Sequence, residues 1–382
     1  MKRTPDTRQS IFRNPAALGF FARRHRLLAV ALGSTWIAFA CVTMPAVSSP
    51  PIASVSDGRY AMGTILEITL ETQDTRAGRR WMESAYEDVA QWERLVSRMQ
   101  PDSEVARLNR TAGQGPQKVD PLVAALISRA IQYSRLTGGS FDISIGPLVD
   151  LWIRAARQNQ LPSPQSIQKA RASVGADRIH VTENLDVELL EAGMSIDLGG
   201  IAKGWALDQL AEKIKQDGGG SALLSFGQSS VWAIGNPVGD SGWRLALRDP
   251  RGGIAGVLSL RDLALSVSSS LGQTSEIEGR KYGHVVNPLT GEALQRAVQV
   301  AVVARDASLA EALSTALVVQ ELDAGLAWVD AAPGVEALWI GENGERTASR
   351  GWQERTQFEP TEAVAFAQRS ISRGSSTRLR KF

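Results

Sequence analysis

The stretch M-S-I-D-L-G-G-I-A-K-G-W-A-L-D-Q-L, Met194 to Leu210, predicts a short strand that runs through a glycine turn into a helix. Asp197, Gly199, Gly200 and Lys203 lie close together within it. Glycines let a backbone approach a ligand closely, and a helix N-terminus presents unpaired N–H groups with a partial positive charge. This arrangement predicts a site for an anion such as phosphate.

The signal is not specific by itself. The stretch matches neither the G-x-x-x-x-G-K-[ST] phosphate loop nor the G-x-G-x-x-G dinucleotide fingerprint. A tight strand-to-helix turn with an exposed lysine would have a similar sequence, so an anion site and a structural turn both stay open at this point.

Composition indicates a globular protein that does not bind nucleic acid. The 382 residues are 43% hydrophobic, which is enough to bury a large core in one large domain or two closely joined ones. The formal net charge is only +2, and no long basic run lies inside the body of the chain. Electrostatic binding of a polyanion therefore has no support.

The N-terminal residues predict export or membrane anchoring. Arg23, Arg24 and Arg26 precede Leu27–Val47, a run without a charged residue. A lipidated Cys41, an uncleaved membrane helix and a cleaved signal all remain open. Since Cys41 is the only cysteine, we expect no internal disulfide in the exported body.

The division into domains follows from these features. We expect a basic leader, hydrophobic segment and Pro/Ser tether over 1–52, a folded domain over 53–355, and a flexible basic tail over 356–382.

Periodicity predicts alternating strands and helices in the folded part. Tyr60–Glu71 has the alternation of a half-buried strand, with Met62 at its entrance, and Ala77–Val96 has the spacing of an amphipathic helix. Gly139–Trp152, which contains Asp142, is predicted to be strand-like, and Ala222–Gly235 is predicted to be a strand. An acidic side chain between Phe141 and Ile143 needs a partner, although it could simply cap a turn.

Polar clusters follow near the C-terminal half. Ser269 lies in a run of three serines at a predicted strand end, and His284 precedes a turn. Glu311 and Thr315, four residues apart on a predicted helix, share one face, which suits a hard cation such as Mg²⁺. A structural histidine and an ordinary Glu–Thr contact would give the same patterns.

Six motifs in this order resemble the ApbE-like flavin transferases, the FAD:protein FMN transferases of exported bacterial compartments. The resemblance runs from about Tyr60 to Leu338. The motifs are A-M-G-T at Ala61, S-E-V-A-R-L-N at Ser103, G-S-F-D-I-S-I-G-P-L-V-D-L-W at Gly139, I-D-L-G-G-I-A-K-G-W-A-L-D at Ile196, Y-G-H-V-V-N-P-L-T-G at Tyr282 and A-E-A-L-S-T-A at Ala310.

The resemblance implies a fold, an activity and a location. The fold would be α+β, similar to the T-fold, with a central flavin cleft between two subdomains. The enzyme would cleave FAD with a divalent metal, usually Mg²⁺, and attach FMN through a phosphoester bond to a Thr or Ser of an acceptor protein, releasing AMP. It would lie on the periplasmic face of the bacterial inner membrane, held through its N-terminal segment.

The resemblance also implies residue roles. Lys203 and Asp197 would belong to the catalytic set, and His284 would orient or deprotonate the acceptor hydroxyl. The metal would be held by Glu311, Thr315 and a main-chain carbonyl at Ala202. The FAD-binding residues would be Met62 against the isoalloxazine ring, Asp142, Gly199, Gly200, Lys203 and Ser269.

Departures from the family pattern leave three activities open. Glu311 and Asn287 stand where the family commonly has aspartate. The candidates are an FMN transferase, an FAD pyrophosphatase that makes FMN and AMP, and a non-catalytic FAD-binding protein. An acid and a hydroxyl on one helix face favour catalysis, since a protein that only binds FAD needs neither.

Overall fold

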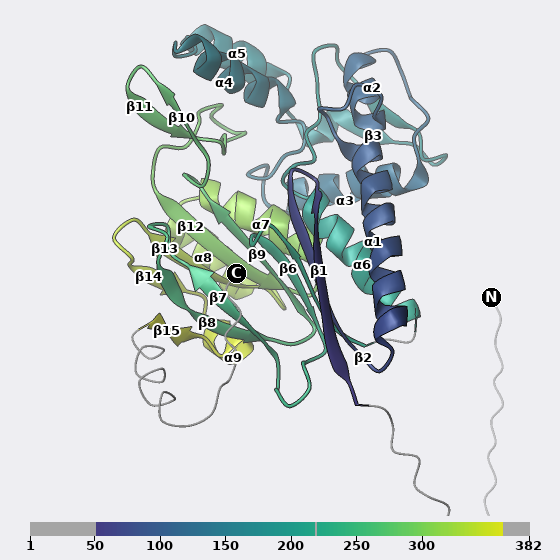
Figure 1. Cartoon of the computed structure of the whole chain (residues 1–382). Coiled ribbons are helices and arrows are strands. Elements are labelled where there is room, and N and C mark those ends of the chain that lie inside the picture. Colours follow the sequence, from purple (N-terminus) through teal and green to yellow (C-terminus); the bar gives the residue numbers. More distant parts are fainter. Residues whose placement is uncertain (1–50, 218–219, 362–382) are drawn as a thin grey trace, which may run out of the picture. The chain divides into compact units, whose positions relative to one another are not determined.

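The computed structural model describes residues 51–217 and 220–361, which belong to a compact unit of Pro50–Phe382 (Figure 1). The run Leu27–Val47, Cys41 and residues 362–382 of the expected tail lie outside the described residues. Among the helices in the described ranges, none has the length and apolar character needed to cross a bilayer.

An eight-stranded sheet forms the centre of the unit (Figure 1). All of its neighbouring strands pair antiparallel. In spatial order the strands are β1 (Ala53–Ala61), β2 (Thr64–Thr72), β5 (Ser221–Phe226), β6 (Ser230–Ile234), β9 (Leu263–Ser269), β12 (Val298–Ala304), β13 (Glu336–Gly341) and β14 (Arg346–Ala348).

Side chains of the central strands are buried on both faces of this sheet. In β6, Trp232 and Ile234 join one core and Val231 and Ala233 join another, as the two-residue period of a strand requires. The first core is completed by helices α1 (Thr75–Val96), α3 (Pro121–Leu136), α6 (Ala202–Gln216) and α7 (Ala307–Val319). The second is covered by β7 (Trp243–Arg248), β8 (Ile254–Leu260) and α9 (Trp352–Thr356), and β15 (Glu359–Pro360) pairs with β8. This mixture of an antiparallel sheet with helices confirms the α+β class.

The remaining elements extend these layers. Trp152 stacks on Tyr282 with ring centroids 5.2 Å apart in a separate small core. The elements of that core are α4 (Gly146–Gln158), α5 (Pro164–Ala172), β10 (Thr274–Ile277) and β11 (Arg280–Gly283). The others are α2 (Glu104–Arg110), the 3₁₀ turn Ala176–Arg178, the hairpin β3 (Ile179–Val181) and β4 (Val187–Leu189), and α8 (Leu322–Ala331).

Two sequence predictions of strands were wrong. The segment 139–152 forms turns and then the start of α4, because Pro147 lies in the first helical turn, where its fixed φ is favourable. The segment 222–235 is a hairpin of two strands, since Gly227 and Gln228 take positive φ values of 53° and 68° and reverse the chain.

The folded chain also continues beyond residue 355, where the sequence places the end of the domain. Phe358 is buried with its ring centroid 6.2 Å from that of Trp352. Glu359 and Pro360 then pair with β8. Apolar burial and strand pairing therefore fix this segment up to the last described residue, 361.

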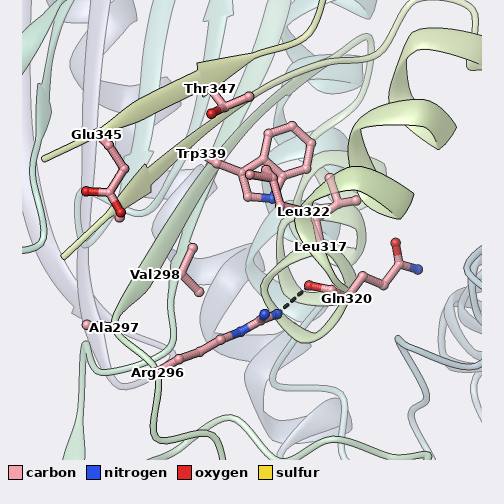
Figure 2. A pocket seen from close by; sticks show the side chains of 10 residues that line it. Arg296, Ala297, Val298, Leu317, Gln320, Leu322, Trp339, Glu345 and Thr347 are labelled. Carbon is pink, nitrogen blue, oxygen red and sulfur yellow. Dashed lines mark hydrogen bonds between the residues drawn. The ribbon is translucent and has the colours of Figure 1, made fainter. Parts of the chain in front are cut away.

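A pocket of about 150 Å³ lies near the C-terminal end of α7 (Figure 2). Arg296 at its edge donates hydrogen bonds to the carbonyls of Val318 and Val319, so it caps α7. None of the residues that the sequence assigns to FAD or metal lines this pocket.

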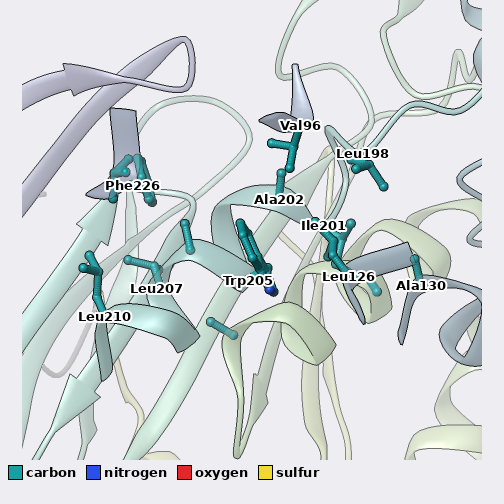
Figure 3. Packing of buried hydrophobic residues seen from close by; sticks show 14 of the residues in the cluster. Val96, Leu126, Ala130, Leu198, Ile201, Ala202, Trp205, Leu207, Leu210 and Phe226 are labelled. Atoms are coloured by element: carbon teal, nitrogen blue, oxygen red, sulfur yellow. The ribbon is translucent and has the colours of Figure 1, made fainter. Parts of the chain in front are cut away.

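Helix α6, which follows the glycine turn, is buried against several elements at once (Figure 3). Trp205 meets Trp92 of α1 edge to face, with centroids 5.5 Å apart. On another side α6 crosses α7 so closely that a Cβ on Gly204 would lie 2.3 Å from the Ala307 carbonyl oxygen. Gly204 is thus required by the close approach of two backbones.

Asp208 joins three elements at the same crossing. Its carboxylate accepts hydrogen bonds from the backbone N–H groups of Ala307 and Ser308 at 2.7 and 3.0 Å, and from the indole of Trp232 at 3.0 Å. Burial raises the pKa of Asp208 above its ordinary value. The acid therefore fixes the start of α7 relative to α6 and β6.

Gly204→Ala should destabilise the protein by about 1–3 kcal/mol, because the carbonyl that the new methyl meets belongs to a backbone and cannot rotate away. This cost is expected to exceed the gain of about 1 kcal/mol in helix propensity. Urea unfolding measures it. The control is Gly58→Ala, where the nearest atom would be 3.5 Å away; equal losses in both variants would contradict the close-crossing explanation.

Candidate functional site

The glycine turn before α6 is held by its own side chains. Asp197 accepts a hydrogen bond at Oδ1 from the Gly199 N–H at 2.8 Å, and its backbone N–H donates to the Ile143 carbonyl at 2.7 Å. Lys203 donates from Nζ to the Gly199 carbonyl at 3.2 Å. The structure therefore brings the acid, the exposed glycine and the lysine together at the N-terminus of α6.

Glu311 reaches this turn from α7. It is 4% exposed, and its Oε2 accepts a hydrogen bond from the Gly204 N–H at 2.6 Å. Its Oε1 forms an ion pair with the Lys203 ammonium. A buried carboxylate needs such partners, and they place its negative charge directly beside the lysine of the turn.

Thr315 lies one helical turn after Glu311, on the same side of α7. A Cβ on Gly200 would be 3.7 Å from Thr315 Oγ1 and 3.3 Å from the ring of Phe141. The Thr315 hydroxyl is also 3.4 Å from the Ser268 hydroxyl at the end of β9. Gly200 is thus within contact distance of Thr315 on α7. A site built from the glycine turn and α7 together requires this closeness.

The oxygen donors beside the turn suit a hard cation. The described residues contain no group of three or more His, Cys, Asp or Glu side chains that could hold a metal. The candidate set is different in kind: the Glu311 carboxylate, the Thr315 hydroxyl and the carbonyl of Ala202, the first residue of α6. These hard oxygens fit Mg²⁺, which in phosphate sites takes few protein ligands and completes its shell with phosphate and water.

His284 follows β11, and its ring Nδ1 is 3.2 Å from the Gln273 carbonyl. A carbonyl only accepts hydrogen bonds, so Nδ1 carries the proton and Nε2 has the lone pair. Desolvation lowers the pKa of His284, the hydrogen bond to the Gln273 carbonyl opposes this, and the positive charge of Lys203 lowers the pKa further. Desolvation and the nearby ammonium therefore favour the neutral imidazole over the imidazolium.

Ser269 and His284 both lie close to Gly272. A Cβ on Gly272 would be 3.4 Å from the Ser269 Cβ and 3.9 Å from the His284 Cε1. Ser269, half-buried, is the last residue of β9, next to Ser268, which contacts Thr315. The structure therefore links the serine run and the histidine to the face of α7 that carries Thr315.

Met62 occupies the tip of the β1–β2 hairpin. With Gly63 it forms a two-residue turn with φ values of 48° and 80°. Its N–H donates to the Glu93 carboxylate at 2.8 Å. A left-handed backbone is unfavourable for methionine, and such strain is typical of positions held for function.

The Asp142 carboxylate accepts hydrogen bonds from other groups of the protein. Oδ1 accepts hydrogen bonds from the N–H and hydroxyl of Ser144 at 2.8 and 2.6 Å, and Oδ2 accepts one from the Ala176 N–H at 2.9 Å. Burial raises the pKa of Asp142 despite these bonds. The residue ties two loops together behind Phe141, the ring beside Gly200.

Sequence reasoning missed three residues that position this site. Asp208 fixes α7, as described above. Asn109 donates to the Ile196 carbonyl at 3.0 Å and accepts from its N–H at 2.7 Å, which fixes the backbone before the turn. Arg98 binds the Asp197 carboxylate. Asn109 and Asp208 do fall within quoted motifs, but Arg98 carries no signal in the sequence.

The fold and these contacts define an α+β protein in which a glycine turn, a lysine and a buried glutamate meet at the N-terminus of α6. Residues 62–339 match the family described as ApbE. The FAD:protein FMN transferase of Treponema pallidum (strain Nichols) is 30% identical over 294 residues, covering 72% of this chain and 81% of that protein. That of Salmonella typhimurium (strain LT2) is 26% identical over 301 residues, covering 76% and 85%.

A solved structure shows the same architecture. The crystal structure of the ApbE protein from Thermotoga maritima has a TM-score of 0.72 with this chain at 26% sequence identity, covering 79% of this chain and 99% of that one. The Pseudomonas stutzeri flavinyl transferase ApbE, at 24% identity and a TM-score of 0.70, shows the same fold. The chain belongs to the ApbE family, which confirms the resemblance seen in its motifs.

The pKa of His284 should lie below the ordinary value of about 6.5 for histidine. Because the folded state binds this proton more weakly than the unfolded chain, the stability contributed by His284 is present above that value and lost as the pH falls. NMR titration of the imidazole measures the pKa. Lys203→Met should raise it, whereas Lys215→Met, at the other end of α6, should not; an unchanged pKa in the first variant would contradict the proximity of the two charges.

Proposed function

We infer that the chain is an FAD:protein FMN transferase. The observation that carries this is the meeting of the glycine turn and Lys203 with the buried Glu311 of α7, in a chain of the ApbE family. A phosphate-binding turn alone would suit many proteins. A carboxylate held beside it from a distant helix suits a protein that would hold a divalent cation against a pyrophosphate, and such a cation would compensate the negative charge that develops during cleavage.

The reaction would be a balanced group transfer. An acceptor Thr or Ser hydroxyl oxygen forms a bond to the FMN-side phosphorus of FAD, the P–O bond to AMP breaks, and AMP leaves with the electron pair. The hydroxyl proton passes to a base. Lys203 and the positive end of the α6 dipole would stabilise the negative charge on the phosphate oxygens.

Mg²⁺ is proposed as the divalent metal. Glu311, Thr315 and the Ala202 carbonyl would hold it, since carboxylate, hydroxyl and carbonyl oxygens are the hard donors that Mg²⁺ prefers. A divalent cation supplies charge neutralisation on the pyrophosphate oxygens. Because Lys203 already pairs with Glu311, the lysine would have to share or release this carboxylate when the metal binds.

His284 is proposed to orient or deprotonate the acceptor hydroxyl. The Gln273 carbonyl would fix the tautomer so that Nε2 offers its lone pair, and the lowered pKa favours this unprotonated form. Asn287, where the family commonly has aspartate, accepts hydrogen bonds from the N–H groups of Leu289 and Thr290 at 2.8 and 3.3 Å. The amide oxygen of Asn287 accepts these two hydrogen bonds as a carboxylate oxygen would.

Met62, Asp142, Gly199, Gly200 and Ser269 are proposed as FAD-binding residues, with Asp197 supporting the turn. Met62, at the strained hairpin tip, would touch the isoalloxazine ring. Asp142 would contribute indirectly, through the two loops that its carboxylate ties together.

The protein is proposed to act outside the cytoplasm, at the periplasmic face of the inner membrane. The support is the uncharged run Leu27–Val47 after basic residues. Lipidation of Cys41, an uncleaved anchor or a cleaved signal would each be compatible with a folded domain that meets an exported acceptor.

Purified protein with FAD and Mg²⁺ should attach FMN to a co-expressed acceptor domain and release AMP in equal amount. In-gel flavin fluorescence and AMP chromatography measure the two products. An acceptor whose target Thr or Ser is changed to Ala is the control. AMP release without acceptor labelling would indicate an FAD pyrophosphatase, and neither product would indicate an FAD-binding protein.

Removing the metal or its proposed ligands should lower AMP release by at least about tenfold, the loss expected when a charge-stabilising group is removed. Chelation with EDTA, Glu311→Gln and Thr315→Val each test this. Mn²⁺ binding, followed by electron paramagnetic resonance, should weaken in both variants. Glu345→Gln, at the separate pocket of Figure 2, is the matched control; Mn²⁺ binding unchanged in Glu311→Gln would overturn the assignment.

A further inference from the structure

Arg98, two residues after α1, is a nearly buried cation that the proposed reaction does not use. Its side chain is 13% exposed. Nη1 donates to Asp197 Oδ2 at 3.0 Å, and Nη2 donates to Asp150 Oδ1 at 2.7 Å. One guanidinium therefore joins the end of α1, the glycine turn and α4, and it contacts the turn through Asp197.

The two ion pairs are not equivalent. The Asp197 side chain is 21% exposed and the Asp150 side chain 54% exposed. Water screens the second pair, and exposed pairs of this kind contribute little. The bond to Asp197 is therefore the one with consequences for the site.

Asp197 divides its two oxygens between Arg98 and the turn. Oδ1 holds the Gly199 N–H at 2.8 Å, and the Gly199 carbonyl accepts from Lys203. A carboxylate that rotates freely could not keep its Oδ1 on the turn. The bond from Arg98 to Oδ2 sets the plane of the carboxylate and so the position of Gly199.

Charge gives Arg98 a second effect at this place. With Arg98, the less exposed Asp197 carboxylate is paired, and the pair has no net charge. Without Arg98, the unpaired Asp197 carboxylate would stand beside a turn that must receive an anionic pyrophosphate. The negative charges of the Asp197 carboxylate and of the pyrophosphate, both partly shielded from water, would repel each other and weaken the binding of FAD.

We propose that Arg98 is a positioning residue for FAD: it orients Asp197 and balances its charge at the turn that receives the pyrophosphate. The proposal rests on the proposed function, since it assigns FAD to this turn. Arg98 acts through Asp197, because its fork is engaged by the two carboxylates.

A double-mutant cycle on FAD affinity tests this. Arg98→Met should raise the Kd for FAD, measured by flavin fluorescence quenching, about tenfold in the wild-type background and less than about twofold in Asp197→Ala. Arg98→Lys keeps the charge but cannot form the fork, so its Kd should fall between those of the wild type and Arg98→Met. Equal losses in both backgrounds would mean that Arg98 acts on FAD directly, which would overturn the proposal.

Two further measurements separate positioning from a merely structural role. Arg98→Met should raise the KM for FAD in AMP release more than it lowers kcat, because ground-state binding is what it removes. Asp150→Asn, which breaks only the exposed pair, and Arg244→Met, which breaks the distant pair with Glu359, should leave the Kd unchanged.

The outcomes also distinguish this proposal from the proposed function. If the wild type neither quenches FAD fluorescence nor releases AMP, both fail. If the wild type binds FAD and Arg98→Met binds it equally well, only the role of Arg98 is overturned. The melting temperature of Arg98→Met checks that this variant is folded.

Discussion

The close crossing of α6 and α7 is the constraint on which the site depends. Gly204 removes the side chain that would keep the helices apart, and Asp208 binds the first N–H groups of α7. With the crossing fixed, Glu311 reaches the Gly204 N–H and the ammonium of Lys203. A buried carboxylate is stable there only because both partners are in place.

Hydroxyl groups line the face of α7 beside this crossing. Ser314 is 3.1 Å from the hydroxyl of Ser266 and 2.8 Å from that of Ser268, while Ser230 lies 3.5 Å from Glu311. Such groups, buried between a helix and a sheet, cost free energy unless they bond to one another. They fix the rotation of α7, and with it the direction in which Glu311 and Thr315 point.

Much of the fold could be predicted from local patterns. The apolar spacing of Ala77–Val96 gives α1, and the alternation of Tyr60–Glu71 from Thr64 onward gives β2, because period depends only on neighbouring residues. Tyr60 itself belongs to the preceding strand, β1. The family, and with it the α+β class, followed from six ordered motifs. The segment around Pro147 was predicted wrongly, since a short apolar run fits a strand or a buried helix equally well.

The sequence by itself determined that Asp197, the glycine pair and Lys203 lie together where a turn leads into a helix, since all lie within a few residues of one another. Only the tertiary structure decided what faces that turn. Glu311 bonds to Gly204 across 107 residues, and Arg98 reaches Asp197 across 99. Contacts over such separations depend on how helices and sheet pack together, which no local pattern specifies.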